Sequence, residues 1–303
     1  MLIILLKPSV YVASALNGVK LWALVVLPAL LPFFFFTALL SKISVTEKLA
    51  KILEKPCKKL FKTSGFAAYV FLMSVLSGYP VGAKIIGDLG ENGLIDSDDA
   101  TRTSTFCSTS GPLFIVGSVG VGMFGSASVG KTLLLTHVLS ALVTGLIFRF
   151  FGKSSCVETA RKPLLKEPPE SDNVLYDCVY SSVVSIATVG GFICVFYVVA
   201  DILQNLDALY PLWKAISLIT KNEEISKAFA YGLIECTRGC KTLALCGLST
   251  YSLTFASALI SFGGVSVLVQ SVAFLKKANV KISVFLLAKI VQTSLSFVLL
   301  FIF

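Results

Sequence analysis

The sequence contains little charge for its length. Only 14% of its 303 residues are Asp, Glu, Lys or Arg, whereas about 25% are charged in a typical soluble domain. A soluble enzyme of this size needs a charged surface, so this class of protein is excluded. Hydrophobic residues make up 55% of the chain, and several stretches of about 20 residues could cross a hydrocarbon layer about 30 Å thick. The composition predicts an all-α, polytopic helical membrane protein.

Residues that build reactive and metal sites are also few or scattered. There is one histidine, His137, and none of the eight cysteines forms a Cys-x-x-Cys pair. Cys236 and Cys240 would share a helix face, but no second pair completes a zinc site. A lone histidine can relay protons, although a packed, hydrogen-bonded role is the favoured interpretation. We therefore expect no metal, no cofactor and no enzymatic activity.

The charge that is present is mostly positive. Lys and Arg number 26 and Asp and Glu 17, which gives a net charge of +9. An excess of Lys and Arg marks the cytoplasmic loops of multi-pass membrane proteins. We expect Ser41–Thr63, which contains seven lysines, and Gly152–Asn173 to lie on this side. Nucleic acid is not an expected partner, because no soluble domain is long enough to present a basic face.

The chain divides into four parts by composition. Residues 1–20 are expected to form a membrane-associated helix. Two membrane repeats, 21–151 and 174–303, flank a polar linker at 152–173 that contains three prolines. Proline and mixed charge in a short stretch are typical of linkers.

The two membrane repeats share an order of segments. Each contains two interrupted apolar segments followed by an uninterrupted one, and Gly-x-Lys occurs at Gly82–Lys84 and Gly239–Lys241. Chance similarity is the alternative. If both basic loops are cytoplasmic, one of the three strong segments between them is re-entrant and the second repeat is inverted relative to the first.

Two interruptions in the first repeat are candidate binding sites. Their residues are Gly78, Tyr79, Pro80, Gly82 and Lys84 in the first, and Ser108, Thr109, Ser110, Gly111 and Pro112 in the second. Proline suits the first turn of a new helix, whose free N–H groups attract anions or polar ligands. Irregular backbone in a membrane must face protein or a watered cavity. Packing of small residues and snorkelling of Lys84 to the headgroups are the alternatives.

The second repeat carries the corresponding candidates. They are Glu235, Thr237, Arg238 and Lys241 in one segment, and Ser261, Gly263, Gly264 and Gln270 in the next. An ionisable residue inside a membrane is a functional candidate by default. Glu235 and Arg238 are spaced to pair on one helix face, so a self-neutralising structural pair is the alternative.

Two further polar residues, Lys289 and Gln292, interrupt the last apolar segment. The Lys289 side chain is long enough to snorkel to the membrane surface.

Four strings carry a resemblance to a known family. They are PALLPFF at Pro28–Phe34, SGYPVGAK at Ser77–Lys84, FCSTSGPLFIVGSVG at Phe106–Gly120 and FGGVSVLVQ at Phe262–Gln270. Together they are similar to the family of the sporulation integral membrane protein YlbJ, over nearly the whole chain. That family carries the nucleoside-recognition Gate domain, a name also given to parts of concentrative nucleoside transporters and of the ferrous-iron transporter FeoB. The resemblance implies a multi-pass protein of the bacterial cytoplasmic membrane that is needed for spore formation.

Two functions are open at this point. The first is a secondary transporter or carrier of a small polar or anionic solute, with an anion favoured by Lys84, Arg238 and Lys241. The lipid bilayer, a coupling ion and a second copy of the chain are its further partners. The second is a non-transporting membrane scaffold required for spore formation. In that case Ser41–Thr63 would bind anionic lipid or a partner, and the interruptions would serve packing.

Overall fold

The computed structural model describes Leu5 and residues 7–42, 45–152 and 173–302. These residues form helices and no strand, as the composition predicts. Most of the predicted linker, residues 153–172, lies outside the described residues.

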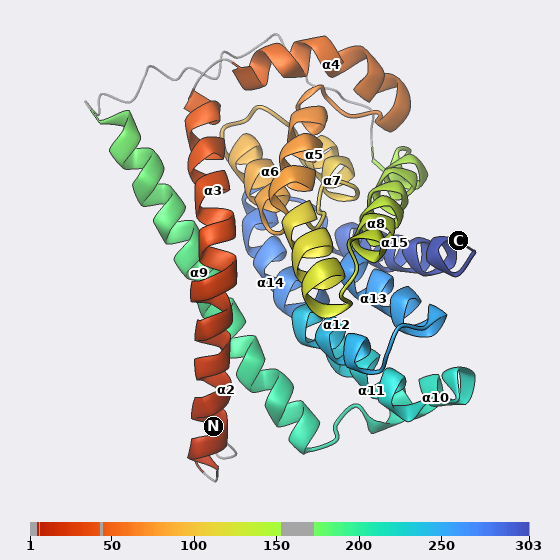
Figure 1. Ribbon diagram of the computed structural model, residues 1–303. Helices are drawn as coiled ribbons and strands as arrows, with labels where there is room; N and C mark the ends of the chain where they lie inside the picture. The colour runs from red at the N-terminus through yellow and green to blue at the C-terminus, as the bar shows by residue number, and fades with distance from the viewer. Residues whose placement is uncertain (1–4, 6, 43–44, 153–172, 303) are drawn as a thin grey trace.

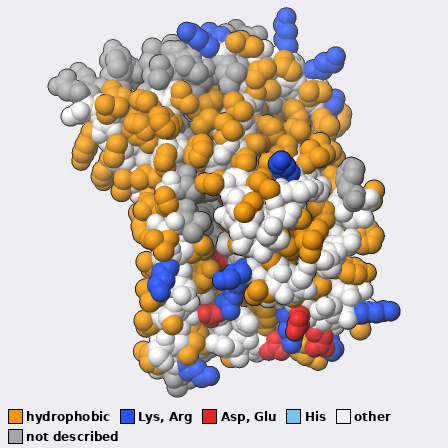
Figure 2. All heavy atoms as spheres, in the orientation of Figure 1, with side chains coloured by type: hydrophobic (Ala, Val, Ile, Leu, Met, Phe, Trp, Pro, Cys, Tyr) orange, Lys and Arg blue, Asp and Glu red, His pale blue; other side chains and the backbone are white. Residues whose placement is uncertain are grey.

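Four helical stretches are long and apolar enough to cross a membrane. They are Ala127–Phe148, Val174–Asn205, Thr250–Ala278 and Ile282–Ile302. A fifth span is formed if the pair Ala50–Phe61 and Phe66–Ser77, bent by 90°, counts as one. Hydrophobic side chains cover much of the face shown in Figure 2, with charged ones at its upper edge and in its lower part. The chain is thus a multi-pass helical membrane protein by length and composition of its helices.

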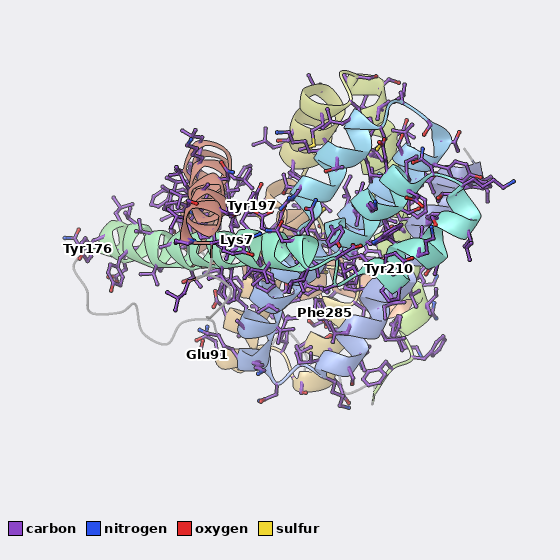
Figure 3. All side chains as sticks on the ribbon, turned by 90° about the horizontal axis from the view of Figure 1, so that it is seen from below. Lys7, Glu91, Tyr176, Tyr197, Tyr210 and Phe285 are labelled. Carbon is purple, nitrogen blue, oxygen red and sulfur yellow. The ribbon has the colours of Figure 1, made fainter. Side chains whose placement is uncertain are left out.

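A long N-terminal helix and helix α9 form an arm beside the other helices. Helix α2 (Pro8–Leu21) continues through a π-helical turn, η1 (Trp22–Val26), into α3 (Leu27–Lys42). Helix α9 (Val174–Asn205) crosses this run and packs along it (Figures 1 and 3). The predicted boundary between residues 20 and 21 therefore falls inside a continuous helix.

The π-helical turn lies directly before Pro28. Pro28 has no N–H to donate to the carbonyl four residues earlier, and its ring crowds that carbonyl. The turn instead closes with a wider bond, in which the Leu27 N–H donates to the Trp22 carbonyl oxygen. A single π-helical turn relieves the clash without breaking the helix.

The remaining helices of the first repeat contain both predicted interruptions. The amphipathic helix α4 (Val45–Phe61) lies across the top of the molecule in Figure 1. It is followed by α5 (Phe66–Ser77), α6 (Val81–Glu91), α7 (Ser97–Ser104), η2 (Leu113–Met123) and α8 (Ala127–Phe148). The gaps between α5 and α6 and between α7 and η2 coincide with the predicted interruptions.

The second repeat has a similar order of elements. After α9 it contains α10 (Tyr210–Thr220), α11 (Glu223–Gly232), α12 (Cys236–Leu245), α13 (Thr250–Phe262), α14 (Gly264–Leu275), η3 (Lys276–Ala278) and α15 (Ile282–Ile302). Here too, a long helix and a short one precede two interrupted pairs and one uninterrupted helix. The inverted relation of the two repeats stays a prediction.

Candidate functional site

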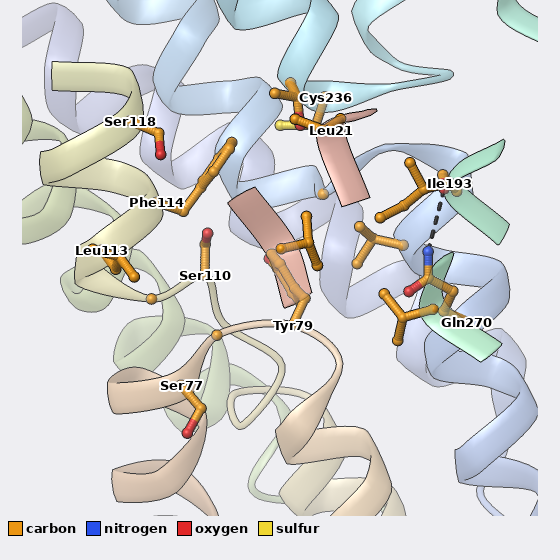
Figure 4. A pocket seen from close by; sticks show the side chains of 18 of the residues that line it. Leu21, Ser77, Tyr79, Ser110, Leu113, Phe114, Ser118, Ile193, Cys236 and Gln270 are labelled. Atoms are coloured by element: carbon orange, nitrogen blue, oxygen red, sulfur yellow. Dashed lines mark hydrogen bonds between the residues drawn. The ribbon is translucent and has the colours of Figure 1, made fainter. Parts of the chain in front are cut away.

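A cavity of about 460 Å³ lies where interrupted helices of the two repeats meet. This volume is in the range of small-molecule sites. Figure 4 shows Tyr79 and Ser110 from the first repeat and Cys236 and Gln270 from the second around it. The cavity is thus built from interruptions that are far apart in sequence.

The two interruptions of the first repeat touch each other at their glycines. Gly78 ends α5 with φ +86°, a conformation that side chains other than glycine rarely adopt. A Cβ atom built on Gly78 would lie 2.7 Å from the backbone nitrogen of Gly111. Next to this contact, the Ser74 and Thr109 hydroxyls are hydrogen-bonded at 2.9 Å. The absence of a side chain at Gly78 therefore lets the two loops meet.

The two interruptions of the second repeat also lie side by side. The backbone N–H groups of Val265 and Ser266 donate to the Leu233 and Ile234 carbonyl oxygens, at 2.7 and 3.2 Å. Glu235 follows directly and is the N-terminal cap of α12. Its carboxylate accepts hydrogen bonds from the backbone N–H groups of Thr237 and Arg238, as a cap residue should. This carboxylate is buried and lines the cavity.

Tyr79 and His137 connect the first repeat to the second. The Tyr79 hydroxyl donates to the Ser261 carbonyl oxygen at 3.2 Å. The Ser110 backbone N–H donates to His137 Nε2 at 2.9 Å. Because Nε2 accepts this bond, the proton of the neutral ring is on Nδ1. This Nδ1 lies 2.9 Å from the Ser261 hydroxyl. His137 is therefore the packed, hydrogen-bonded residue that was expected. Its two contacts join an interruption of each repeat.

Lys289 lies at the centre of these contacts and does not snorkel. Its side chain comes from the middle of α15 and is 1% exposed. Its Nζ donates to the Ser108 carbonyl oxygen at 2.5 Å and the Ser261 carbonyl oxygen at 3.2 Å. It also lies 2.9 Å from the Tyr79 hydroxyl and 3.0 Å from Gln292 Oε1. The side chain points inward, where these oxygens accept its N–H groups.

The structure brings only part of the predicted residues to the cavity wall. The lining ones are Gly78, Tyr79, Ser110, Gly111, Glu235, Thr237, Gly263 and Gln270. Other predicted residues are buried behind the wall, namely Pro80, Gly82, Ser108, Thr109, Ser261 and Gly264, while Pro112 is half-buried. The two sets belong to the same loops, and neighbouring residues of one loop therefore differ in whether they face the cavity.

The three cations expected to favour an anion do not line the cavity. Lys84 pairs with Asp88 at 3.0 Å, one turn further along α6. The Arg238 guanidinium pairs with Asp201 of α9 and donates to Gln204 at 2.6 Å, rather than pairing with Glu235. Lys241 is exposed. All three follow an interruption in sequence, but none of them belongs to the cavity lining.

Several lining residues were missed by sequence reasoning. One wall is apolar and comes from the arm, through Leu21, Leu24, Val26 and Phe33 of the N-terminal run and Ile193 of α9. No local pattern in these helices indicates a cavity. Ser77 and Ser266 are polar lining residues that adjoin the predicted ones. Gln270 donates to Ser266 at 3.3 Å (Figure 4).

No metal site is evident in the described part of the chain. No group of three or more His, Cys, Asp or Glu side chains there could hold a metal ion. The polar groups around the cavity are instead hydroxyls, amides, one carboxylate and backbone atoms, which suit an organic solute.

Comparisons with known proteins agree with the resemblance seen in the motifs. The family model of the Gate domain, described as nucleoside recognition, matches residues 23–127. The chain is 29% identical over 307 residues to the sporulation integral membrane protein YlbJ of Bacillus subtilis (strain 168), covering 94% of this chain and 75% of that protein. No solved structure matches the chain. The predicted family resemblance is therefore confirmed.

Proposed function

Since the chain is a relative of the sporulation integral membrane protein YlbJ, we propose that it is a multi-pass carrier of a small polar solute in a bacterial cytoplasmic membrane. One observation carries the proposal: interruptions from both repeats line a single cavity. Interrupted helices from two repeats that meet at a solute site are typical of secondary transporters. Rocking of one repeat against the other would expose this cavity to each side in turn.

The lining favours a neutral solute with both polar and apolar parts. Glu235, Gln270 and the hydroxyl of Ser77 provide hydrogen-bonding groups, and the arm provides an apolar wall. The cavity wall contains no Lys or Arg among the described residues. An anion would therefore face the Glu235 carboxylate without a lining cation, so we rank it below a neutral solute. A nucleoside combines a flat ring with hydroxyl groups and is the first class to test, given the description of the matching family model.

Uptake into proteoliposomes tests this proposal. The panel contains radiolabelled nucleosides and, as the competing class, anionic metabolites. We expect wild-type vesicles to take up a nucleoside. Glu235→Gln is expected to reduce uptake about 10-fold or more, since a hydrogen bond to a charged group is worth about 1.5–3 kcal/mol. Gln270→Leu is expected to reduce it about 2- to 10-fold, since a neutral hydrogen bond is worth about 0.5–1.5 kcal/mol. Lys241→Ala is the matched control because this exposed side chain lies on α12, the helix that Glu235 caps.

Two outcomes would contradict the proposal. One is the absence of uptake of every solute in the panel by folded wild-type protein. The other is uptake that responds to Glu235→Gln and Gln270→Leu no more than to Lys241→Ala. Uptake restricted to anions would keep the carrier but overturn the solute class.

The scaffold function is supported by a different element, helix α4. Lys51, Lys55 and Lys59 are exposed on it, and so is Ile52, which suits a helix lying in a membrane interface. Replacing the three lysines by Gln in a spore-forming host separates the two functions. Loss of spores in this variant with normal spore yield in Glu235→Gln would favour the scaffold, and the reverse result would favour the carrier.

A further inference from the structure

Lys289 is surrounded by oxygen atoms but by no carboxylate. Four oxygens lie within 3.2 Å of its Nζ, and the Tyr79 ring centroid lies 4.7 Å away. Among the described residues, no Asp or Glu forms an ion pair with it. A buried charge is normally held by a counter-charge, so this one depends on dipoles alone.

The acceptors, as the Gln292 amide is oriented, match the charged form of the lysine. Three of the four oxygens, those of Ser108, Ser261 and Gln292, are carbonyl or amide oxygens that can only accept. Three acceptors need three N–H groups, which an ammonium has and a neutral amine lacks. The geometry therefore places a positive charge at this point.

The backbone that supplies two of these oxygens is of the kind that binds cations. Ser261 lies in the last turn of α13, where carbonyl groups are free and the helix dipole is negative. Ser108 lies in the unwound stretch between α7 and η2. In secondary transporters, unwound carbonyls and helix C-termini hold the coupling cation. In this protein the same kind of oxygen atoms surrounds the Lys289 ammonium group instead of a free ion.

Unpaired polar atoms surround the same point. Gln292 Nε2 and the Ser108 hydroxyl are buried and have no hydrogen-bond partner in the described part of the chain. Both residues already give an oxygen to Lys289. Of the two, only the Ser108 hydroxyl oxygen has lone pairs that a separate cation could use, since Gln292 Nε2 can only donate.

We propose that the Lys289 ammonium is a tethered cation that occupies a monovalent-cation site formed by the interruptions of both repeats. Its charge holds the Ser108 and Ser261 loops together, as a bound ion would. Removing the side chain is expected to leave a site for a free primary ammonium ion. This inference deepens the proposed function, because a carrier with a tethered charge needs no exchangeable coupling ion at this position. The cation site itself can be tested without any solute.

Thermal unfolding of the purified full chain in detergent provides the test. Ethylammonium chloride is added to wild type, Lys289→Ala and Lys289→Met, with tetramethylammonium chloride at the same concentration as the salt control. We expect ethylammonium to raise the Tm of Lys289→Ala by at least about 2 °C and to leave wild type unchanged, as binding to the native state alone predicts. Tetramethylammonium has no N–H group and should have no effect. Lys289→Met fills the space without charge and should be destabilised but not rescued.

A second variant keeps the test decisive if Lys289→Ala does not fold. Lys289→Gln retains N–H donors and is shorter than lysine, so a small cation still has room. Its Tm is expected to rise with ammonium chloride and not with tetramethylammonium chloride. If neither variant can be purified folded, their folded yield from cells grown with ethylammonium is compared with that from untreated cells, and rescue is expected.

Three results would overturn the inference. The first is equal stabilisation of wild type and the variants by ethylammonium. The second is a Lys289→Met variant as stable as wild type, which would show that charge is not needed. The third is no rescue of Lys289→Ala or Lys289→Gln by either ammonium ion. Because no solute is present, these results do not depend on the uptake experiment.

Discussion

Gly78 shows how one residue connects two interruptions. Its φ of +86° turns the chain out of α5, and its hydrogen atom faces the backbone of Gly111. A methyl group there would be strained by the torsion angle and would also overlap a neighbouring backbone. The two effects can be separated, because Gly247 has a similar φ of +92° with nothing within 4 Å of an added Cβ.

We therefore predict different effects for Gly78→Ala and Gly247→Ala. Both variants carry the torsional strain, but only the first forces two loops apart, which adds about 1–3 kcal/mol of overpacking. The Tm of Gly78→Ala in detergent is expected to lie about 2–5 °C below that of Gly247→Ala. Equal Tm values would show that the Gly78–Gly111 approach is not a rigid contact.

At the scale of elements, small residues let the arm helices pack closely. A Cβ atom on Gly190 of α9 would lie 2.6 Å from the Trp22 ring, whereas one on Gly191 would meet nothing within 4 Å. Trp22 also donates its ring N–H to the Ile186 carbonyl oxygen at 3.0 Å. Small residues at a helix contact are typical of membrane proteins, in which backbones pack by close approach.

The neighbouring glycines predict opposite effects of the same substitution. Gly191→Ala is expected to leave stability unchanged or raise it by up to about 1 kcal/mol, because alanine favours helix. Gly190→Ala should displace the Trp22 ring, break its hydrogen bond to the Ile186 carbonyl, lower the Tm and change the Trp22 emission spectrum. The emission is measured in a Trp213→Phe background, which leaves Trp22 as the only tryptophan. Identical spectra for the two variants would contradict the packing shown here.

At the scale of the whole molecule, the turns fall into two groups. The α6–α7 turn lies beside the α14–α15 turn, where Ser97 donates to the Asn279 carbonyl oxygen at 2.6 Å and Lys277 pairs with Glu91 at 2.9 Å. The start of α8 lies beside the start of α13, and Ser128 and Thr250 line one small pocket there. Corresponding turns of the two repeats are thus in different groups, which is the arrangement that inverted repeats require.

Labelling of single cysteines tests this inversion. In a cysteine-free background, Asn92→Cys and Asn279→Cys are expected to react from one side of the membrane, and Ser128→Cys and Thr250→Cys from the other. All four positions are exposed. A membrane-impermeant maleimide should therefore label only one pair in intact cells, and all four after permeabilisation. Labelling of one member of each pair would contradict the inverted topology.

Much of the fold could be predicted from the sequence because its causes are local. Apolar stretches of sufficient length form membrane helices, since lipid leaves no other way to satisfy the backbone. Glycine and proline clusters interrupt helices through their own torsional limits, so the gaps at Ser77–Lys84 and Ser108–Pro112 coincide with real helix ends. The π-helical turn before Pro28 has the same kind of local cause.

The composition of the cavity wall was decided only by tertiary structure. Lys84, Arg238 and Lys241 follow the interruptions in sequence, yet their side chains do not reach the cavity. Lys289 comes from a helix with no interruption, and it donates to the carbonyl oxygens of Ser108 and Ser261. The direction in which a helical side chain points depends on how the helix is rotated against its neighbours. That rotation is set by packing between α15, α13 and α8, and between α9 and the N-terminal run, which are distant in sequence. Local torsional preferences thus placed the interruptions, and long-range packing chose which side chains surround them.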